Sequence, residues 1–448
     1  MKKVLSTILA ATMVAATLLT GCSGGGKQSS AGTGSGTAAA SGDAPVTVTF
    51  WGAAISEDRQ SFFTDFQKKV HETYPNITLD FLGVPGSLND YRQKLDVAIN
   101  AGTAPDITND FRPSLVTNGY YQNLNEYFDK WDKKDEINTQ LIKSNKTYDP
   151  KGTGLYALPY SSQTWNLWVR PDWLKEVGMS TPTTWDDFFT AVQKMTDKSK
   201  NRYGLAIRGG AGSANTLEML MYAYSGITNY FTSDGKCTIN DPKNVEFVQK
   251  YLGCYNKYTA QDDLTKSWTQ LANAFQSGKA GIVAHNLGSG TSMAKAFSND
   301  TSKYQAAMFP VSEKGYVVHP SLMPLGLSMS SSSKDKDAVW KVMTLYLSKD
   351  VNLAYGKLYG EIPANTKAAQ DQFFQNTQYM SVGVNLETSD QVKFNDTPYY
   401  LPSYTNIQTQ MESSVQKVMS GQMSAKDMLD KWASLLEKAY AEYKSEKK

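Results

Sequence analysis

The sequence predicts an α/β protein, because strand-like and helix-like segments alternate from residue 46 onward. Val46–Phe50 is rich in β-branched and aromatic residues, which is typical of a strand. Phe62, Phe66 and Val70 then recur every four residues, which predicts a helix, and Ile77–Phe81 again has the composition of a strand. Strands that alternate with helices indicate βαβ crossovers, so we expect mostly parallel sheets covered by helices on both faces.

The alternation continues along the rest of the chain. Tyr91, Leu95 and Ile99 mark one face of a second helix, and residues 106–108 have the pattern of a third strand. Further segments are expected as a strand at 280–284 and as helices at 184–195, 244–255, 267–277, 337–347 and 425–444. The α/β pattern therefore extends to the C-terminus.

The composition excludes several classes of protein. A length of 448 residues is enough for about three domain-sized units. Apolar residues make up 40% and charged residues 20% of the chain, which excludes wholesale disorder and a multi-span membrane protein. The 45 basic residues almost balance the 43 acidic ones, so the excess positive charge of a nucleic-acid-binding protein is missing. Aromatic residues reach 12%, more than the cores need, and we expect some of them to line a ligand site.

The N-terminus has the layout of a secretory leader. A basic start precedes an uncharged run, residues 4–20, and the chain then reads Leu-Thr-Gly-Cys up to Cys22. This ending resembles the lipobox of bacterial lipoproteins, which implies cleavage of residues 1–21 and a diacylglycerol on Cys22; an uncleaved anchor is the alternative. Residues 22–44 then form the lipidated cysteine and a Ser/Gly-rich linker with a reach of about 26 Å. We expect an extracytoplasmic protein anchored to the outer face of the cell membrane.

Two further cysteines, Cys237 and Cys254, lie in the part of the chain that would be exported. An oxidising compartment permits a disulfide between them. The alternative is two small buried thiols, because Cys237 lies in a predicted strand, 236–239, and Cys254 on a predicted helix. The sequence leaves both alternatives open.

Motifs for metal, nucleotide or nucleophile chemistry are missing. His71, His285 and His319 stand far apart, whereas a zinc site needs three or four converging ligands. Residues 152–157 match the residue pattern of a dinucleotide-binding fingerprint, but a proline follows where the phosphate-binding helix should begin. Residues 197–201 offer too few oxygens for calcium. We therefore expect no cofactor and no metal, and a pair of carboxylates for glycoside hydrolysis is the enzyme alternative that stays open.

Four stretches, in order, resemble the bacterial extracellular solute-binding proteins of family 1, the receptors of ATP-binding-cassette (ABC) importers. The first stretch is Gly102–Ile107. The second is Leu158–Tyr160 followed by Leu167–Leu174, Gly178 and Pro182–Phe188. The third is Ala274–Gly281, and the fourth is Ser333–Trp340 with Gly360–Pro363. Val169-Arg170 stands where many members have Tyr-Asn, and this form resembles a lipoprotein subgroup that includes binders of larger or acidic saccharides. Residues 321–326 lack the usual Gly-Gly pair, which leaves the hinge there less well defined.

The resemblance implies a two-lobed, periplasmic-binding-protein-like fold of type II. Each lobe would be a mostly parallel sheet flanked by helices, with a hinge between the lobes and ligand held between them. Lobe one would comprise residues 45–160 and 321–365, and lobe two residues 161–320 and 366–448.

A sugar offers C–H faces to aromatic rings and hydroxyls to planar polar groups, so we expect its binding residues to combine these two types of side chain. Trp51 follows the first strand, and Asp110 and Phe111 follow the third, where ligands gather in open α/β sheets. The alternatives are a core tryptophan for Trp51 and a helix or turn cap for Asp110.

The remaining candidates follow from the resemblance and from local context. The family places Gln163 and Trp165 in a loop facing the ligand, and it aligns His285 and Asn286 with a contact segment and Tyr399 with an aromatic platform; surface packing is the alternative for Tyr399. Two further candidates are Arg208, which would suit a carboxylated sugar or form a salt bridge, and Glu361, in a Gly-Glu-Ile-Pro turn.

These observations predict a binding protein and not an enzyme. We expect a monomeric, lipid-anchored receptor that binds a carbohydrate, most simply an oligosaccharide, and delivers it to the transmembrane subunits of an ABC permease. An anchored glycoside-processing enzyme, a receptor for a non-sugar solute and a structural surface protein with no small ligand are the alternatives.

Overall fold

The structure is a computed structural model that describes residues 44–446 apart from positions 54, 56, 85–87, 150, 321 and 322. The expected leader, the lipidated Cys22 and nearly all of the expected linker lie outside the described residues. No helix in the described part of the chain is long and apolar enough to cross a membrane.

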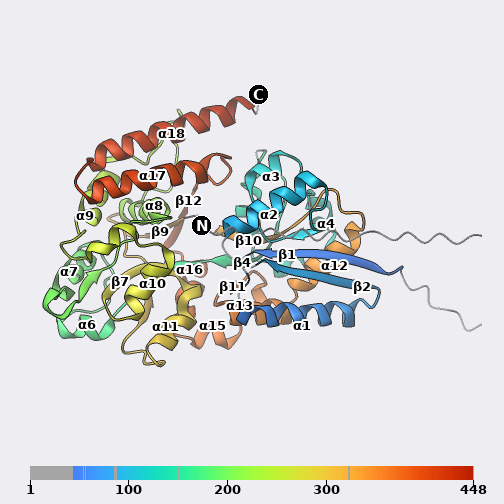
Figure 1. The fold of residues 1–448 in the computed structure, drawn as a ribbon, viewed down its shortest axis with the longest axis horizontal. Coiled ribbons are helices and arrows are strands. Elements are labelled where there is room, and N and C mark those ends of the chain that lie inside the picture. The colour runs from blue at the N-terminus through green and yellow to red at the C-terminus, as the bar shows by residue number, and fades with distance from the viewer. Residues whose placement is uncertain are drawn as a thin grey trace, which may run out of the picture. The chain divides into compact units, whose positions relative to one another are not determined.

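A six-stranded sheet organises the first part of the chain, and we call the residues around it lobe one (Figure 1). Its strands, in spatial order, are β11 (Ile362–Pro363), β4 (Leu158–Gln163), β10 (Met323–Met329), β3 (Ile107–Thr108), β1 (Val46–Ala53) and β2 (Ile77–Val84). β1 runs parallel to β2 and β3, whereas β10 runs antiparallel to β3 and β4, and β11 antiparallel to β4.

The alternation of side chains along β1 places apolar residues on both faces of this sheet. Phe50 is buried against Phe63 of α1 (Glu57–Thr73) and Tyr346 of α12 (Lys336–Tyr346). Trp51, the next residue, packs on the other side with Tyr91 of α2 (Leu88–Ala101). The remaining helices of this lobe are α3 (Pro113–Thr117), α4 (Asn125–Lys130), α5 (Thr139–Lys146), α13 (Lys349–Tyr359) and α14 (Thr366–Ala369).

A four-stranded sheet organises the second part, which we call lobe two. Its order is β6 (Tyr203–Leu205), β7 (Ala280–Asn286), β5 (Trp165–Val169) and β8 (Gln305–Ala307), and a separate parallel pair joins β9 (Val317–Pro320) to β12 (Val392–Asn395). The helices are α6 (Pro171–Glu176), α7 (Trp185–Met195), α8 (Ser213–Ser225), α9 (Pro242–Leu252), α10 (Trp268–Gln276), α11 (Gly290–Ala296), α15 (Gln372–Asn376), α16 (Met380–Thr388), α17 (Tyr404–Met419) and α18 (Ala425–Glu446). Short 3₁₀ turns are η1 (Lys134–Glu136), η2 (Lys198–Lys200), η3 (Gln261–Thr265) and η4 (Leu287–Ser289).

The α/β class and the two sheets confirm the predicted fold class, but the expectation of mostly parallel sheets is wrong. In lobe two, β7 is parallel to β6 but antiparallel to β5, which is antiparallel to β8. In lobe one, β10 enters the sheet after the chain has passed through lobe two, and it runs against both of its neighbours. The short helical crossovers that enforce parallel pairing are therefore confined to the first three strands.

The chain passes from one sheet to the other at Thr164, the single residue between β4 and β5. β9 belongs to the strand pair of lobe two and β10 to the sheet of lobe one, so a second crossing lies between them, at positions that the structure does not describe. After β11 the chain leaves the lobe-one sheet and continues into the last helices of lobe two, which makes a third connection between the lobes. Strand β4 thus extends lobe one to Gln163, three residues beyond the boundary expected at 160.

The predicted helices are present, and the final one docks as core. α18 buries Met428, Trp432 and Leu436 completely. The strand predicted at 236–239 is wrong: Cys237 makes a single β-bridge with Phe231, because its backbone N–H donates to Glu437 of α18 and not to a neighbouring strand.

Cys237 and Cys254 are both buried and both free thiols, so the disulfide that the sequence left open is not formed. Cys254 lies just after α9, and its thiol donates a hydrogen bond to the Lys250 carbonyl at 3.3 Å. Burial raises the pKa of the Cys254 thiol to about 11, which keeps it protonated and unreactive near neutral pH.

Candidate functional site

Trp51 lies within β1, two residues before the strand ends at Ala53, and not after the strand as expected; its ring is half-buried on the α2 side of the sheet. The Tyr91 hydroxyl donates to the Trp51 carbonyl at 3.1 Å, and the Lys94 ammonium lies 5.0 Å from the centre of the indole ring. Part of the ring stays accessible. Trp51 therefore packs against α2 and still presents part of its ring to solvent.

Asp110 is the centre of an ion-pair network. Its carboxylate is 2% exposed and lies 2.9 Å from an Arg92 guanidinium nitrogen and 2.8 Å from Arg112 Nε. Arg112 also pairs with Asp96 at 2.7 Å. Both oxygens of Asp110 therefore face guanidinium groups, and these contacts fix the segment after β3 to α2. A contact between Asp110 and a ligand stays a prediction.

Phe111 and Tyr399 belong to different lobes and are connected through a third ring, Tyr148. Tyr148 follows α5 and stacks on Phe111 with ring centroids 4.5 Å apart, while its other contact is Tyr399 at 5.9 Å. Two predicted residues that are far apart in sequence thus share one aromatic stack. Tyr148 was missed because it lies in a turn without any strand-end signal.

Trp165, His285 and Asn286 come together through strand pairing. Trp165 opens β5 opposite Asn286 of β7, and His285 is the next residue on β7. The backbone of Trp165 is also held by His319 of β9, whose Nε2 lies 3.0 Å from the Trp165 carbonyl oxygen. The register therefore places the three predicted side chains at one end of the lobe-two sheet.

Trp268, the first residue of α10, joins these residues to Arg208. Its ring stacks on the His285 imidazole with centroids 3.4 Å apart and meets the Trp165 ring edge-on at 4.9 Å. The Arg208 guanidinium lies 5.2 Å from the same ring. Sequence reasoning identified this segment only as the start of a helix, and the tryptophan directly after Ser267 was the available signal.

Arg208 has no carboxylate within ion-pair distance among the described residues, so the salt bridge offered as its alternative is not formed. Its Nε donates to the Ala211 carbonyl at 2.6 Å, and its guanidinium fills the space beside Gly212, where φ is +80° and an added Cβ would lie 2.0 Å from Nη2. Burial lowers the pKa of Arg208 to about 10, and Glu412 opposes this effect.

Burial likewise lowers the pKa of His285 to about 4, so its imidazole is neutral at pH 7.

A small cavity of about 20 Å³ lies beside Trp165 in lobe two. It is lined by Trp165, Asn215, Glu218, Met219, Tyr222, Tyr230, Pro320, Asn395, Thr397, Tyr399 and Tyr404. Glu218 of α8 is 4% exposed. Sequence reasoning missed Glu218, although a single acid within the apolar run of α8 is an available signal. The cavity brings the predicted Trp165 and Tyr399 to one place.

Glu361 lies apart from this group. Its Oε2 accepts hydrogen bonds from the Ser161 hydroxyl at 2.7 Å and the Tyr355 hydroxyl at 2.8 Å, which ties β4 to α13. Gln163 pairs with Met323 through the backbone of β4, and its side chain lies outside the described residues.

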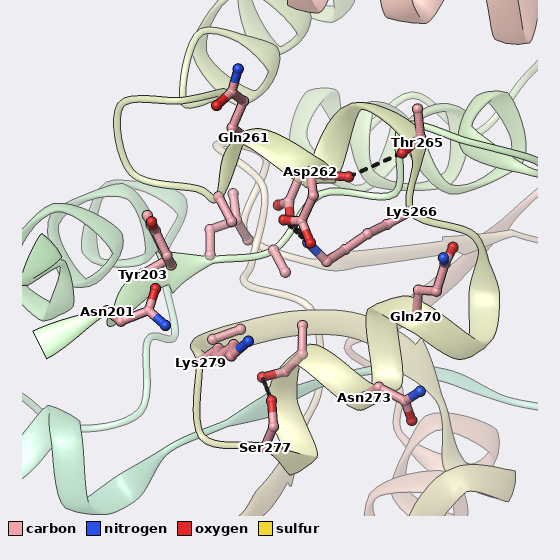
Figure 2. Close-up of a pocket in the computed structure, with 16 residues that line it drawn as sticks. Asn201, Tyr203, Gln261, Asp262, Thr265, Lys266, Gln270, Asn273, Ser277 and Lys279 are labelled. Carbon is pink, nitrogen blue, oxygen red and sulfur yellow. Dashed lines mark hydrogen bonds and ion pairs between the residues drawn. The ribbon is translucent and has the colours of Figure 1, made fainter.

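A larger hollow, of about 750 Å³, opens between η3, α10 and β6 (Figure 2). Figure 2 shows polar side chains around it, including Asn201, Gln261, Gln270 and Asn273. None of the predicted site residues lines it. Asp263, which lines it, pairs with Lys266 at 2.6 Å and accepts a hydrogen bond from the Ile207 N–H, so this region supports the segment that carries Arg208.

No group of three or more His, Cys, Asp or Glu side chains among the described residues is arranged to hold a metal ion. The candidate site therefore consists of aromatic rings (Trp51, Phe111, Tyr148, Trp165, Trp268, Tyr399), one unpaired guanidinium, a neutral imidazole and a buried carboxyl. Flat apolar faces with a few placed polar groups are what binding of a small polar ligand requires.

The chain belongs to the bacterial extracellular solute-binding protein family, whose model matches residues 53–353. Relatives and structural neighbours of this chain are substrate-binding proteins of ABC transporters and not enzymes, in agreement with the prediction of a binding protein.

A binding protein of Brucella abortus (strain 2308) is 24% identical over 343 residues, which cover 72% of this chain and 77% of the relative. The polygalacturonan/rhamnogalacturonan-binding protein YtcQ of Bacillus subtilis (strain 168) is 29% identical over 235 residues, 49% of this chain and 46% of that protein. Among solved structures, an ABC transporter solute-binding protein of Thermotoga lettingae bound with α-D-tagatose has a TM-score of 0.72 at 20% identity and covers 88% of this chain and 99% of that one. The chain is thus similar to sugar-binding members of the family.

Proposed function

We propose that this protein is the lipid-anchored receptor of an ABC importer, that it binds a carbohydrate between its two lobes, and that it delivers the carbohydrate to the membrane permease. Cys22 would carry the lipid, and the linker that follows would let the body move against the permease. In this proposal the receptor works as a monomer.

The observation that carries the proposal is the aromatic arrangement around Trp165. Trp165 and Trp268 of lobe two form one ring contact, and Arg208 lies over the Trp268 ring. Phe111 and Tyr148 of lobe one form a second group with Tyr399 of lobe two. The small cavity lined by Trp165, Tyr399 and Glu218 brings the two groups to one place. Rings of this kind stack on the C–H faces of sugars, and the polar groups bind hydroxyls. A relative that binds polygalacturonan or rhamnogalacturonan and a solved structure with bound tagatose support a carbohydrate.

The proposal extends to a saccharide that carries a carboxylate. Arg208 forms no direct ion pair in the described part of the chain, where Glu412 acts on it only at longer range, and a uronate would supply a direct carboxylate partner. Arg170 does not share this role, because its guanidinium already pairs with Asp172 and packs on Trp173.

A thermal-shift scan of residues 23–448 tests the proposal. The panel contains galactose-, glucose- and galacturonate-based mono- and trisaccharides, together with amino acids and polyols. A ligand at about 100 times its dissociation constant adds roughly 2.7 kcal/mol, which raises the melting temperature by several degrees. Stabilisation by a carbohydrate supports the receptor, stabilisation by an amino acid or polyol alone redirects it to a non-sugar solute, and a flat panel contradicts it.

Labelling with radioactive palmitate tests the anchor. Wild-type protein produced in a bacterial host should incorporate label and sediment with membranes, whereas Cys22→Ser should do neither. Equal labelling of both proteins would contradict the lipid anchor.

A further inference from the structure

Glu218 is a buried carboxyl group whose two oxygens have different surroundings. Oε2 accepts hydrogen bonds from the Tyr404 hydroxyl at 2.8 Å and from Gln408 Nε2 at 2.5 Å. Oε1 has no hydrogen-bond partner in the protein and is also shielded from solvent, because the residue is only 4% exposed. A buried carboxylate oxygen without a partner is costly, whereas the same oxygen in a carboxylic acid is a donor that needs an acceptor.

The cavity beside Glu218 is the place where such an acceptor fits. Its volume, about 20 Å³, is that of one water molecule or one ligand hydroxyl. Trp165 and Tyr399 line the same cavity, and both belong to the aromatic arrangement of the proposed ligand site.

We propose that Glu218 is a ligand-contacting residue that donates a hydrogen bond from its protonated carboxyl to an oxygen of the carbohydrate, and that carbohydrate binding is therefore linked to a proton. The inference rests on the proposed function and adds a specificity-determining residue to it. Loss of this proton would leave two acceptors facing each other and would weaken binding.

The groups that face Glu218 from the elements around it leave its charge uncompensated. They are Tyr222 on α8, Tyr230, Cys237, Tyr399 before α17 and Tyr404 on α17. Asp396 lies one residue further away and accepts a hydrogen bond from the Tyr230 N–H. None of them is a cation. Burial raises the pKa of Glu218 to about 8, while the hydrogen bonds from Gln408 and Tyr404 oppose the rise.

The neighbouring groups titrate outside the range in which Glu218 does. Burial raises the pKa of Asp396 to about 6 and raises the pKa values of Tyr222, Tyr399, Tyr404 and Cys237 above their usual values. His285, with a pKa of about 4, and Arg208, with a pKa of about 10, also lie outside the range. A change in affinity between pH 7 and pH 9 therefore reports on Glu218.

The test is isothermal titration of residues 23–448 with galactotriose, maltotriose and trigalacturonate at pH 7, 8 and 9. For a carboxyl with a pKa of about 8, wild-type affinity should fall about tenfold from pH 7 to pH 9. Glu218→Gln keeps a donor that does not titrate, so its affinity should not change with pH and should exceed that of the wild type at pH 9. Glu218→Leu should bind about tenfold or more weakly than wild type at pH 7. The matched control is Glu313→Gln, at an exposed glutamate that pairs with Lys243, and it should keep the wild-type pH profile.

Thermal unfolding without ligand supplies an independent readout. The carboxyl has a higher pKa when folded than when unfolded, so its contribution to stability is complete below the unfolded value and is lost as pH rises toward about 8. The melting temperature of wild type relative to Glu218→Gln should fall between pH 5 and pH 8.

The outcomes separate the two proposals. Binding that is independent of pH and equal in wild type and Glu218→Leu overturns the role of Glu218 and leaves the receptor intact. A melting difference with unchanged ligand affinity also overturns it, because Glu218 would then be structural only. Failure of all three saccharides to bind at pH 7 contradicts the carbohydrate receptor itself, and the inference falls with it.

Discussion

Tyr148 stacks on Tyr399, with ring centroids 5.9 Å apart and ring planes 17° apart. Tyr148 follows α5 in lobe one, and Tyr399 precedes α17 in lobe two, so the contact links the two halves of the proposed site. Tyr148 also stacks on Phe111, which lies three residues after β3. A ligand between the lobes would meet or displace this stack, which makes Tyr399 the sharpest test of the proposed site.

Replacing Tyr399 with alanine should weaken carbohydrate binding by about 1–2 kcal/mol, or roughly 5- to 30-fold. The ring is only half-buried, so the melting temperature without ligand should change little. Isothermal titration against the saccharide that stabilises the wild type measures the effect. Tyr400→Ala is the matched control, because Tyr400 is the next residue but packs on Tyr443 of α18. Equal losses in the two variants would exclude a specific role for Tyr399.

Trp268→Ala should also weaken binding by about 1–2 kcal/mol, because it removes the ring on which His285 stacks and over which Arg208 lies. If the ligand carries a carboxylate, the loss should be larger for trigalacturonate than for galactotriose, since Arg208 would lose its position. Trp340→Ala on α12, where the ring packs against Tyr127 and Trp131, serves as the control and should leave both affinities unchanged. A similar loss in both tryptophan variants would point to general destabilisation.

Asp110→Asn should lower the free energy of unfolding by about 3 kcal/mol, because it leaves Arg92 and Arg112 without their shared buried partner. Urea denaturation followed by tryptophan fluorescence gives the value. Asp65→Asn removes an exposed pair with Lys68, whose side chains are 77% and 68% exposed, and should cost about 0–1 kcal/mol. A cost for Asp110→Asn as small as that for Asp65→Asn would show that the network is not stabilising.

Residues 23–448 should carry two free thiols that react only after unfolding, since Cys237 and Cys254 are both buried. Alkylation with iodoacetamide in the native state should add no mass, and alkylation in 6 M guanidinium without reductant should add two groups per chain. Intact-mass spectrometry distinguishes these results. Two additions that appear only after a reductant is supplied would demonstrate a disulfide and contradict the structure.

Much of the fold was predictable because its signals are local. The four-residue spacing of Phe62, Phe66 and Val70 lies within α1, and the β-branched run at 46–50 lies within β1. The parallel neighbours β1, β2 and β3 follow from the alternation of these segments. The place of the antiparallel β10 could not be predicted from this alternation. It depends on where the chain returns to the sheet after more than 150 residues of lobe two.

The candidate site divides in the same way. Trp51, Phe111, Trp165 and Tyr399 were predictable from their residue type and position, at strand ends or in stretches that match the family. Glu218, Tyr148 and Trp268 were not, because each acts through a partner that is distant in sequence: Glu218 and Tyr404 are 186 residues apart, and Trp165 and Trp268 belong to different elements.

By itself the sequence determined the class of protein, the alternation of strands and helices and the chemical types that a sugar site needs, because these are properties of residue identity and short-range order. The tertiary structure decided which of those side chains are already satisfied and which are not. Asp110 is paired with two arginines, whereas Arg208 forms no ion pair with any carboxylate that the structure describes, and Glu218 keeps one oxygen unpaired. Such pairing depends on distances between segments that only the packed chain brings together. Burial then determines how much free energy each unpaired group costs.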